Sequence, residues 1–317
     1  MAITPSTRRA LQIGRKQAQE VLKFRNRALR KRAVALKAKP TRMRSMRTVE
    51  IEPKLLRAVG DPQTAGVLIA EGDSWFDYPF NDILRMLEDY HAYEVESVAH
   101  KGDRVEEMAY GLGQLEELTR TIEKVLRQGE IPKAILLSGG GNDVAGDEFG
   151  MLLEHAQSPL PGFNDQVISG IIDQRVKIAY VTILSAVTKI SEERLNRKLP
   201  ILVHGYDYPV PDGRGFAGGW WHLPGPWLEP GFREKGYAIM AERMKLMKQL
   251  IDRFNTMLKD IAAMNEFRHV TYVNLRDTLS TGSKYKRYWA NELHPTERGF
   301  ELVTNRFAKA LEQLPAS

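Results

Sequence analysis

Three short segments of this chain hold side chains suited to acyl transfer. Gly72-Asp73-Ser74 contains a serine, Asn142 follows a run of glycines, and His294 precedes a proline near the C-terminus. A serine hydroxyl attacks an ester when a base takes its proton, and histidine titrates near neutral pH. Amide N–H groups stabilise the oxyanion that forms. These residue types indicate a serine-dependent hydrolase or acyltransferase.

The segments that contain Ser74 and Asn142 follow predicted strands, whereas His294 lies in a late loop. Short apolar runs predict buried strands, and they alternate with segments of helical periodicity. This alternation predicts an α/β domain over residues 51–317, with a parallel sheet of about five strands and right-handed crossovers. The expected strands are 67–70, 94–99, 134–137, 201–204 and 270–275. Ligands of such sheets bind outside the carboxyl ends of the strands, where the serine is expected.

A complete site can be assembled at this sheet edge. The backbone N–H groups of Ser74 and Gly102 and the amide of Asn142 would form an oxyanion hole, with His294 as the base. The simpler interpretation makes Ser74 a helix cap, but the remaining segments favour a nucleophile.

Other polar residues near the predicted strand ends have structural alternatives. We expect Asp73 to brace the turn and Asp143 to cap a helix. Asp207 follows the fourth strand and is a candidate for contacting substrate. His204, three residues earlier, would be either structural or part of the cleft.

The same residues resemble the four sequence blocks of the SGNH (GDSL-type) hydrolases. The blocks are Gly72-Asp73-Ser74, Gly102, Gly140-Gly141-Asn142-Asp143 and His294-Pro295, and the resemblance spans residues of about 67 to 305. It implies a flavodoxin-like three-layer α/β/α sandwich and hydrolysis of esters or acetyl esters. It also implies that Ser74 is the nucleophile, that Gly102 and Asn142 complete the oxyanion hole, and that His294 is the base.

One position departs from the family pattern. The resemblance leads us to expect Asp three residues before the histidine, where this chain has Asn291, followed by Glu292. Glu292 could reach His294, Asn291 could orient the ring without a charge, or the acid could come from elsewhere. Because a neutral orienter stabilises an imidazolium less well, the hypothesis favoured here is Glu292.

A Gly/Pro/Trp-rich insertion occupies residues 210–235. Three of the five tryptophans lie in it, and Trp75 and Trp289 flank the first and last blocks. The insertion either seals a small satellite core or forms a substrate wall for an acyl group or a sugar face. The substrate-binding candidates are Trp75, Trp220, Trp221, Trp227 and Asp207.

Charge is distributed unevenly along the 317 residues. Residues 1–50 hold 15 Lys and Arg against two acids, whereas the remainder holds 31 basic and 38 acidic residues. A helix is expected from Arg8 to Leu36. This basic arm would be a strut packed on the body, a dimer arm, an organelle presequence, or a segment for an anionic surface, with residues 8–47 as the contact.

The remaining composition narrows the function classes. The absence of cysteine excludes disulfides and a thiol nucleophile. With no P-loop and no Gly-x-Gly-x-x-Gly after a strand, no cofactor is expected. The N-terminus lacks an apolar signal segment, so we expect a cytoplasmic protein.

The expected activity is hydrolysis of a small ester, an acyl lipid or an O-acetylated carbohydrate. The same residues would also suit an O-acyltransferase. A non-catalytic anionic-surface binder with a relict cleft is a further alternative. A metal-dependent phosphoesterase is disfavoured, because the metal-binding runs of the two-metal enzymes are absent.

Overall fold

The computed structural model describes residues 3–37, 64–146, 148–218 and 223–314. Trp220, Trp221 and residues 38–47, the last part of the predicted contact segment 8–47, therefore lie outside the described residues.

Within the described residues, five strands form one parallel sheet in the order β2-β1-β3-β6-β7. This is the flavodoxin-like order of doubly wound sheets, so the predicted fold class is confirmed. β1, β3 and β6 are largely apolar and buried on both faces, whereas β2 and β7 contain polar or half-buried residues and end two residues earlier than predicted. The bounds of all five strands differ from the predicted ones by at most two residues. They are β1 Gly66–Glu71, β2 Tyr93–Ser97, β3 Ala134–Leu137, β6 Ile201–His204 and β7 Val270–Val273.

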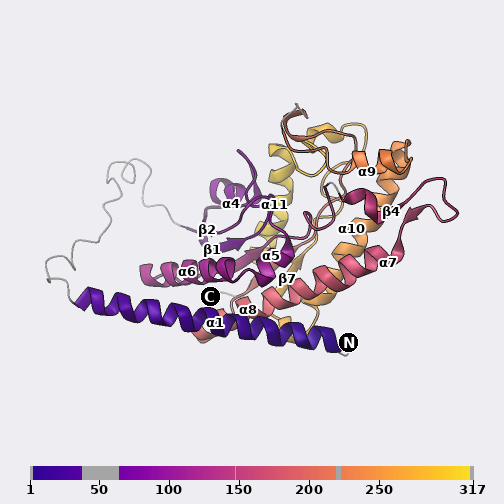
Figure 1. Ribbon diagram of the computed structural model, residues 1–317. Coiled ribbons are helices and arrows are strands. Elements are labelled where there is room, and N and C mark those ends of the chain that lie inside the picture. The colour runs from indigo at the N-terminus through magenta and orange to yellow at the C-terminus, as the bar shows by residue number, and fades with distance from the viewer. Residues whose placement is uncertain (1–2, 38–63, 147, 219–222, 315–317) are drawn as a thin grey trace, which may run out of the picture.

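Helices cover both faces of the sheet (Figure 1). One face carries α4 (Ile83–His91) and α11 (Glu297–Glu312), which pack together. The other face carries α5 (Val105–Tyr110), α6 (Leu112–Gln128), α8 (Lys177–Leu195) and α10 (Met240–Ala262). Helix α8 is preceded without a break by α7 (Asp165–Ile168) and a π-helical segment (Ser169–Val176).

Two small elements were not predicted from the sequence. A short hairpin joins β4 (Leu153–Glu154) to β5 (Gly162–Phe163), and α9 (Glu229–Glu234) lies in the Gly/Pro/Trp-rich insertion. Both are too short to show a hydrophobic period. The hairpin follows β3 and α9 follows β6, so both lie in the connections that leave the carboxyl ends of these strands.

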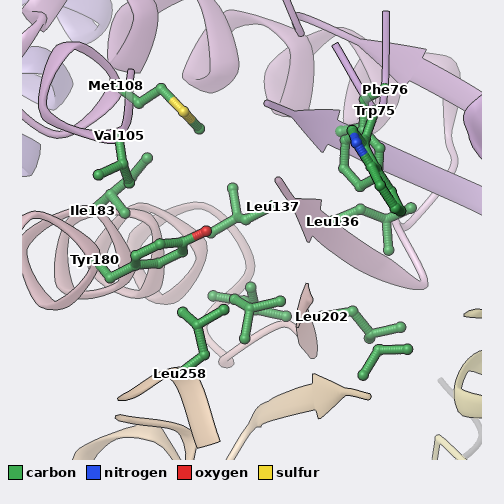
Figure 2. Packing of buried hydrophobic residues seen from close by; sticks show 14 of the residues in the cluster. Trp75, Phe76, Val105, Met108, Leu136, Leu137, Tyr180, Ile183, Leu202 and Leu258 are labelled. Atoms are coloured by element: carbon green, nitrogen blue, oxygen red, sulfur yellow. The ribbon is translucent and has the colours of Figure 1, made fainter. Parts of the chain in front are cut away.

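The core lies on both sides of the strands. In β3, Leu136 and Leu137 point to opposite faces of the sheet, as strand geometry requires (Figure 2). Figure 2 shows Phe76 on the side of Leu136 and Tyr180 on the side of Leu137. The hydroxyl of Tyr180 donates to the carbonyl of Gly139 at 2.6 Å, so core packing also fixes the loop that follows β3.

Helix α1 (Pro5–Lys37) lies outside this sandwich, across α8 and α6 (Figure 1). At Gly14 the contact is so close that an added Cβ would lie 2.2 Å from the carbonyl oxygen of Thr182. Arg25 of α1 and Arg194 of α8 both pair with the buried Glu123 of α6, at 2.8 and 2.7 Å. These contacts attach the first two thirds of α1 to the body, whereas residues 30–37 are all exposed. In the described part of the chain, every helix is too short or too polar to span a bilayer.

Candidate active site

The turn after β1 is built by close contact between strand ends. Gly72 is needed there because an added Cβ would lie 2.6 Å from the Cβ of Ser138. The buried Asp73 accepts hydrogen bonds from the Ser138 hydroxyl at 2.7 Å and the Trp75 N–H at 3.0 Å. It also accepts one from the hydroxyl of Tyr206. Asp73 therefore joins the ends of β1, β3 and β6 and braces the turn.

Ser74 and His294 meet at this edge of the sheet. The Ser74 Oγ lies 2.7 Å from the Nε2 of His294. The indole N–H of Trp75 donates to the carbonyl of Leu293 at 3.1 Å, which fastens the serine turn to the histidine loop. The two side chains predicted to be nucleophile and base are thus within hydrogen-bonding distance.

Asn291 orients the other side of the imidazole ring. Its Oδ1 lies 2.9 Å from the backbone N of Leu293, 2.9 Å from the backbone N of His294 and 3.1 Å from the His294 Nδ1. Backbone N–H groups can only donate, so the atom that faces them is the amide oxygen. The His294 Nδ1 therefore carries its proton, and the Nε2 is left to accept from Ser74.

Glu292 does not contact His294, contrary to the hypothesis favoured from the sequence. Its carboxylate is fully buried and accepts four backbone N–H groups of the insertion at 2.7 to 3.0 Å. The donors are Gly213, Trp227, Leu228 and Glu229. The side chain turns away because these donors satisfy its charge, and it fixes the insertion against the histidine loop.

Burial sets the protonation state of His294. It lowers the pKa of His294 to about 3, and no neighbouring charge contributes to this shift. The neutral imidazole, which is the form that can take a proton from Ser74, therefore prevails across the physiological range.

The predicted oxyanion donors differ in whether they line the cavity beside Ser74. Asn142 lines the same cavity as Ser74 and His294, and its Nδ2 donates one hydrogen to the Asp103 carbonyl at 2.9 Å. The second hydrogen of that amide remains for a ligand. The backbone N–H groups of Ser74 and Gly102 have no acceptor among the described residues. Gly102 itself does not line the cavity.

An apolar cavity of about 50 Å³ opens beside Ser74. Its far wall comes from α10, which contributes Met247, Leu250, Ile251 and Phe254. The other apolar side chains of the wall are Trp75, Val144, Ala145, Tyr206, Pro209, Leu228, Trp289 and Leu293. These four side chains of α10 therefore belong to the core and also line this cavity.

Three tryptophans in the described residues lie near Ser74 and His294, and they differ in their contact with the cavity. Trp75 lines the cavity. Trp227 does not line it, but its ring stands edge-to-face with His294 at a centroid distance of 5.6 Å. Trp289, which had been noted only as a flanking residue, is fully buried and lines the cavity.

Asp207 lies at the cavity, but its carboxylate is occupied by backbone donors. The carboxylate accepts the backbone N–H groups of Tyr208, Asp277, Thr278 and Leu279 at 2.6 to 3.0 Å. These donors occupy the carboxylate and tie the β6 loop to the chain after β7.

Two further side chains have structural roles. Asp143 accepts the backbone N–H of Val105 at 2.9 Å, which caps the start of α5 from another loop. His204 is fully buried against Trp75, Phe76 and Phe307, away from the cavity. Among the described residues, no group of three or more His, Asp or Glu side chains is arranged to hold a metal ion.

Tyr78 is a residue of the site that sequence reasoning missed. Its ring stacks on His294 with a centroid distance of 4.2 Å and an interplanar angle of 19°. Its hydroxyl lies 3.0 Å from the Nδ2 of Asn291. Proximity to Ser74 in sequence was the one available signal, and it does not show which residue the ring would meet.

Comparisons with known proteins gave weak structural similarities. No protein-family model and no curated protein sequence matches the chain. A structure described as a possible lipase from Chitinophaga pinensis is 14% identical over 78% of this chain and 98% of that chain, with a TM-score of 0.44. A catalytic mutant of Axe2, an acetylxylan esterase from Geobacillus stearothermophilus, is 15% identical over 80% and 98%, with a TM-score of 0.38. A carbohydrate esterase family 3 protein from Talaromyces cellulolyticus is 10% identical over 78% and 97%, with a TM-score of 0.39. Similarity at this level does not define a family.

Proposed function

We propose that this protein is an ester hydrolase that works through an acyl-enzyme on Ser74. The observation that carries the proposal is the hydrogen-bonded series from Ser74 through His294 to Asn291, at the mouth of an apolar cavity. The series positions a nucleophile, a base and an orienting group in line.

The proposed reaction has two steps. In the first, the Ser74 Oγ bonds to the ester carbonyl carbon while its proton passes to the His294 Nε2. The oxyanion is held by the backbone N–H groups of Ser74 and Gly102 and by the Asn142 amide, and His294 then gives the proton to the departing alcohol. In the second, a water molecule replaces the alcohol, and its attack releases the acid and restores Ser74.

The size of the cavity supports a short acyl group. About 50 Å³ is one third of the roughly 150 Å³ of an apolar cavity that accepts benzene. The lining is apolar, as an acetyl or propionyl group requires. The alcohol would remain outside the cavity, so small esters, acyl lipids and O-acetylated carbohydrates are all substrate classes within the proposal.

A series of p-nitrophenyl esters tests this function. The full-length protein should hydrolyse acetate faster than butyrate, and butyrate faster than octanoate, and Ser74→Ala should remove all three activities. Activity that survives Ser74→Ala would overturn the mechanism. Faster release of p-nitrophenol with added alcohol, with an ester as product, would assign an O-acyltransferase instead. No activity on any ester would favour a non-catalytic protein with a relict cleft.

We also propose that α1 attaches the protein to an anionic bilayer surface. Apart from Lys37 at the last position, nine basic residues of this helix are exposed, against a single acid, Glu20. They are Arg8, Arg9, Arg15, Lys16, Lys23, Arg27, Arg30, Lys31 and Arg32. Each basic side chain near an anionic bilayer contributes about 1 kcal/mol, so a helix with this many would bind measurably.

Sedimentation with vesicles tests the α1 proposal. The protein should pellet with phosphatidylserine vesicles but not with phosphatidylcholine vesicles, and high salt should release it. A triple variant, Arg30→Gln/Lys31→Gln/Arg32→Gln, should bind more weakly, while its esterase activity stays the same. Equal pelleting with both vesicles, or a dimer lost in the triple variant, would contradict the bilayer proposal.

A further inference from the structure

Tyr78 contacts both His294 and the residue that orients it. The phenol ring lies nearly parallel to the imidazole at 4.2 Å, and the phenol oxygen accepts the Asn291 Nδ2–H at 3.0 Å. Asn291 is 1% exposed, so that N–H would otherwise be buried without a partner. One side chain therefore covers the face of the base and holds the amide that fixes its tautomer.

The need for such a residue follows from the charges around the base. His294 becomes a cation when it takes the Ser74 proton, and in a carboxylate-containing triad a negative charge stabilises that cation. Here the residues that contact the ring are Ser74, Asn291, Tyr78 and Trp227, and none of them carries a charge. Asp73, which is next to Ser74 in sequence, and Glu292, which is two residues before His294, are both occupied by other donors.

An aromatic face can supply part of the missing stabilisation. The π-face of a phenol ring is negative, and it attracts a cation placed over it within about 6 Å of the centroid. Tyr78 satisfies this geometry in its stacked arrangement with His294. The attraction is stronger where water is excluded, and His294 is only 6% exposed.

We propose that Tyr78 is a positioning residue for His294. Its hydroxyl holds Asn291, and its ring face stabilises the imidazolium that forms when Ser74 loses its proton. This inference rests on the proposed function. Tyr78 thereby supplies to His294 part of what a carboxylate supplies in other serine hydrolases.

Two substitutions at position 78 separate the two roles. Tyr78→Phe keeps the ring face and removes the acceptor, whereas Tyr78→Leu removes both. We expect kcat to fall about threefold in Tyr78→Phe and more than tenfold in Tyr78→Leu, with KM within twofold of wild type. Tyr90→Leu is the matched control, because Tyr90 is 62% exposed on α4, and it should leave both constants unchanged. Equal kcat in wild type and Tyr78→Leu, or equal losses in the two variants, would overturn the proposal.

A spectroscopic measurement keeps the inference testable without activity. In ¹⁵N-labelled wild-type protein, NMR should show the His294 imidazole protonated on Nδ1 at neutral pH, and the same signal should weaken in Tyr78→Phe. A wild-type ring protonated on Nε2 would overturn the inference, as would a Tyr78→Phe signal identical to wild type. An Nδ1-protonated ring in a protein that hydrolyses no ester would instead reject the proposed function and leave the geometry intact.

Discussion

The Nδ1 of His294 lies 3.1 Å from the Oδ1 of Asn291, whereas the carboxylate of the adjacent Glu292 is bound by backbone N–H groups of the insertion. The imidazole of His294 is therefore oriented by a neutral amide. Two backbone N–H groups force the amide oxygen toward the ring, so the tautomer matches the one that a carboxylate would select. Asn291 thus supplies orientation without charge.

Asn291→Asp should increase activity. A charged acceptor strengthens a hydrogen bond by about 1 to 1.5 kcal/mol over a neutral one, which corresponds to roughly a tenfold rise in kcat. The carboxylate would also raise the pKa of His294 from about 3. Because the base must be neutral, the acid limb of the kcat/KM profile should move to higher pH in this variant.

Asn291→Ala is the complementary variant, because it removes the acceptor of the His294 Nδ1 proton. Without an acceptor for the Nδ1 proton, the ring is free to place its proton on Nε2, which then cannot accept from Ser74. We therefore expect kcat to fall at least a hundredfold. The wrong tautomer in a serine protease lowers kcat by about 10⁴. Wild-type kcat in Asn291→Ala would contradict the role given to this residue.

Glu292→Gln should lower stability more than catalysis. Gln has one amide oxygen, so two of the four backbone N–H groups would face an NH2 group instead of an acceptor at this fully buried position. We expect a cost of about 2 to 4 kcal/mol in the free energy of unfolding. Urea unfolding measures this change. The kcat of the folded variant should exceed that of Asn291→Ala by at least tenfold. A loss of kcat as large as for Asn291→Ala, with unchanged stability, would show that Glu292 acts on His294.

Met247→Ala should shift the acyl preference toward longer chains. Met247 is buried on α10 and lines the cavity beside Ser74, so its truncation would lengthen the space available to the acyl group. The kcat/KM for octanoate relative to acetate should rise at least tenfold. Met240→Ala, on the same helix but outside the cavity, should keep the wild-type ratio. An unchanged ratio in Met247→Ala would show that the acyl group lies elsewhere.

Glu71→Gln should remove a pH dependence of stability. Burial raises the pKa of Glu71 to about 9, so the folded state keeps a proton that the unfolded state loses above its ordinary pKa of 4.5. Stability therefore falls as pH rises through this window, by about 1.4 kcal/mol per pH unit. Urea unfolding at pH 7, 8 and 9 should show this slope in wild type and in Glu94→Gln, an exposed control, but a flatter one in Glu71→Gln. Identical slopes in all three proteins would contradict the buried, protonated carboxyl.

The strands of the sheet could be predicted from the sequence because each strand is a short, continuous segment of the chain. Residues 134–137 are apolar throughout, and residues 201–203 form an apolar run that ends at His204. The structure has strands at 134–137 and 201–204. The proximity of Ser74 and Asn142 could be predicted because both follow parallel strands that end at one edge, whereas His294 lies in the loop before α11.

The orientation of adjacent side chains was beyond sequence reasoning. Asn291 and Glu292 are neighbours, and the charge of Glu292 made it the more attractive partner for His294. The outcome depended on N–H groups at residues 213 and 227–229, which no local pattern reveals. The contact between Tyr78 and Asn291 likewise joins residues 213 positions apart. For Asn291 a local signal did exist, because Asn side chains often accept backbone N–H groups two and three residues on.

Mass spectrometry after covalent labelling tests the central claim most directly. A fluorophosphonate should react with the wild-type protein once, on the peptide that contains Ser74, and should abolish hydrolysis of p-nitrophenyl acetate in proportion to labelling. Ser74→Ala should take up no label and hydrolyse no ester, while its unfolding curve stays close to that of wild type. A label on another residue, or ester hydrolysis that persists in Ser74→Ala, would contradict the assignment of Ser74 as nucleophile.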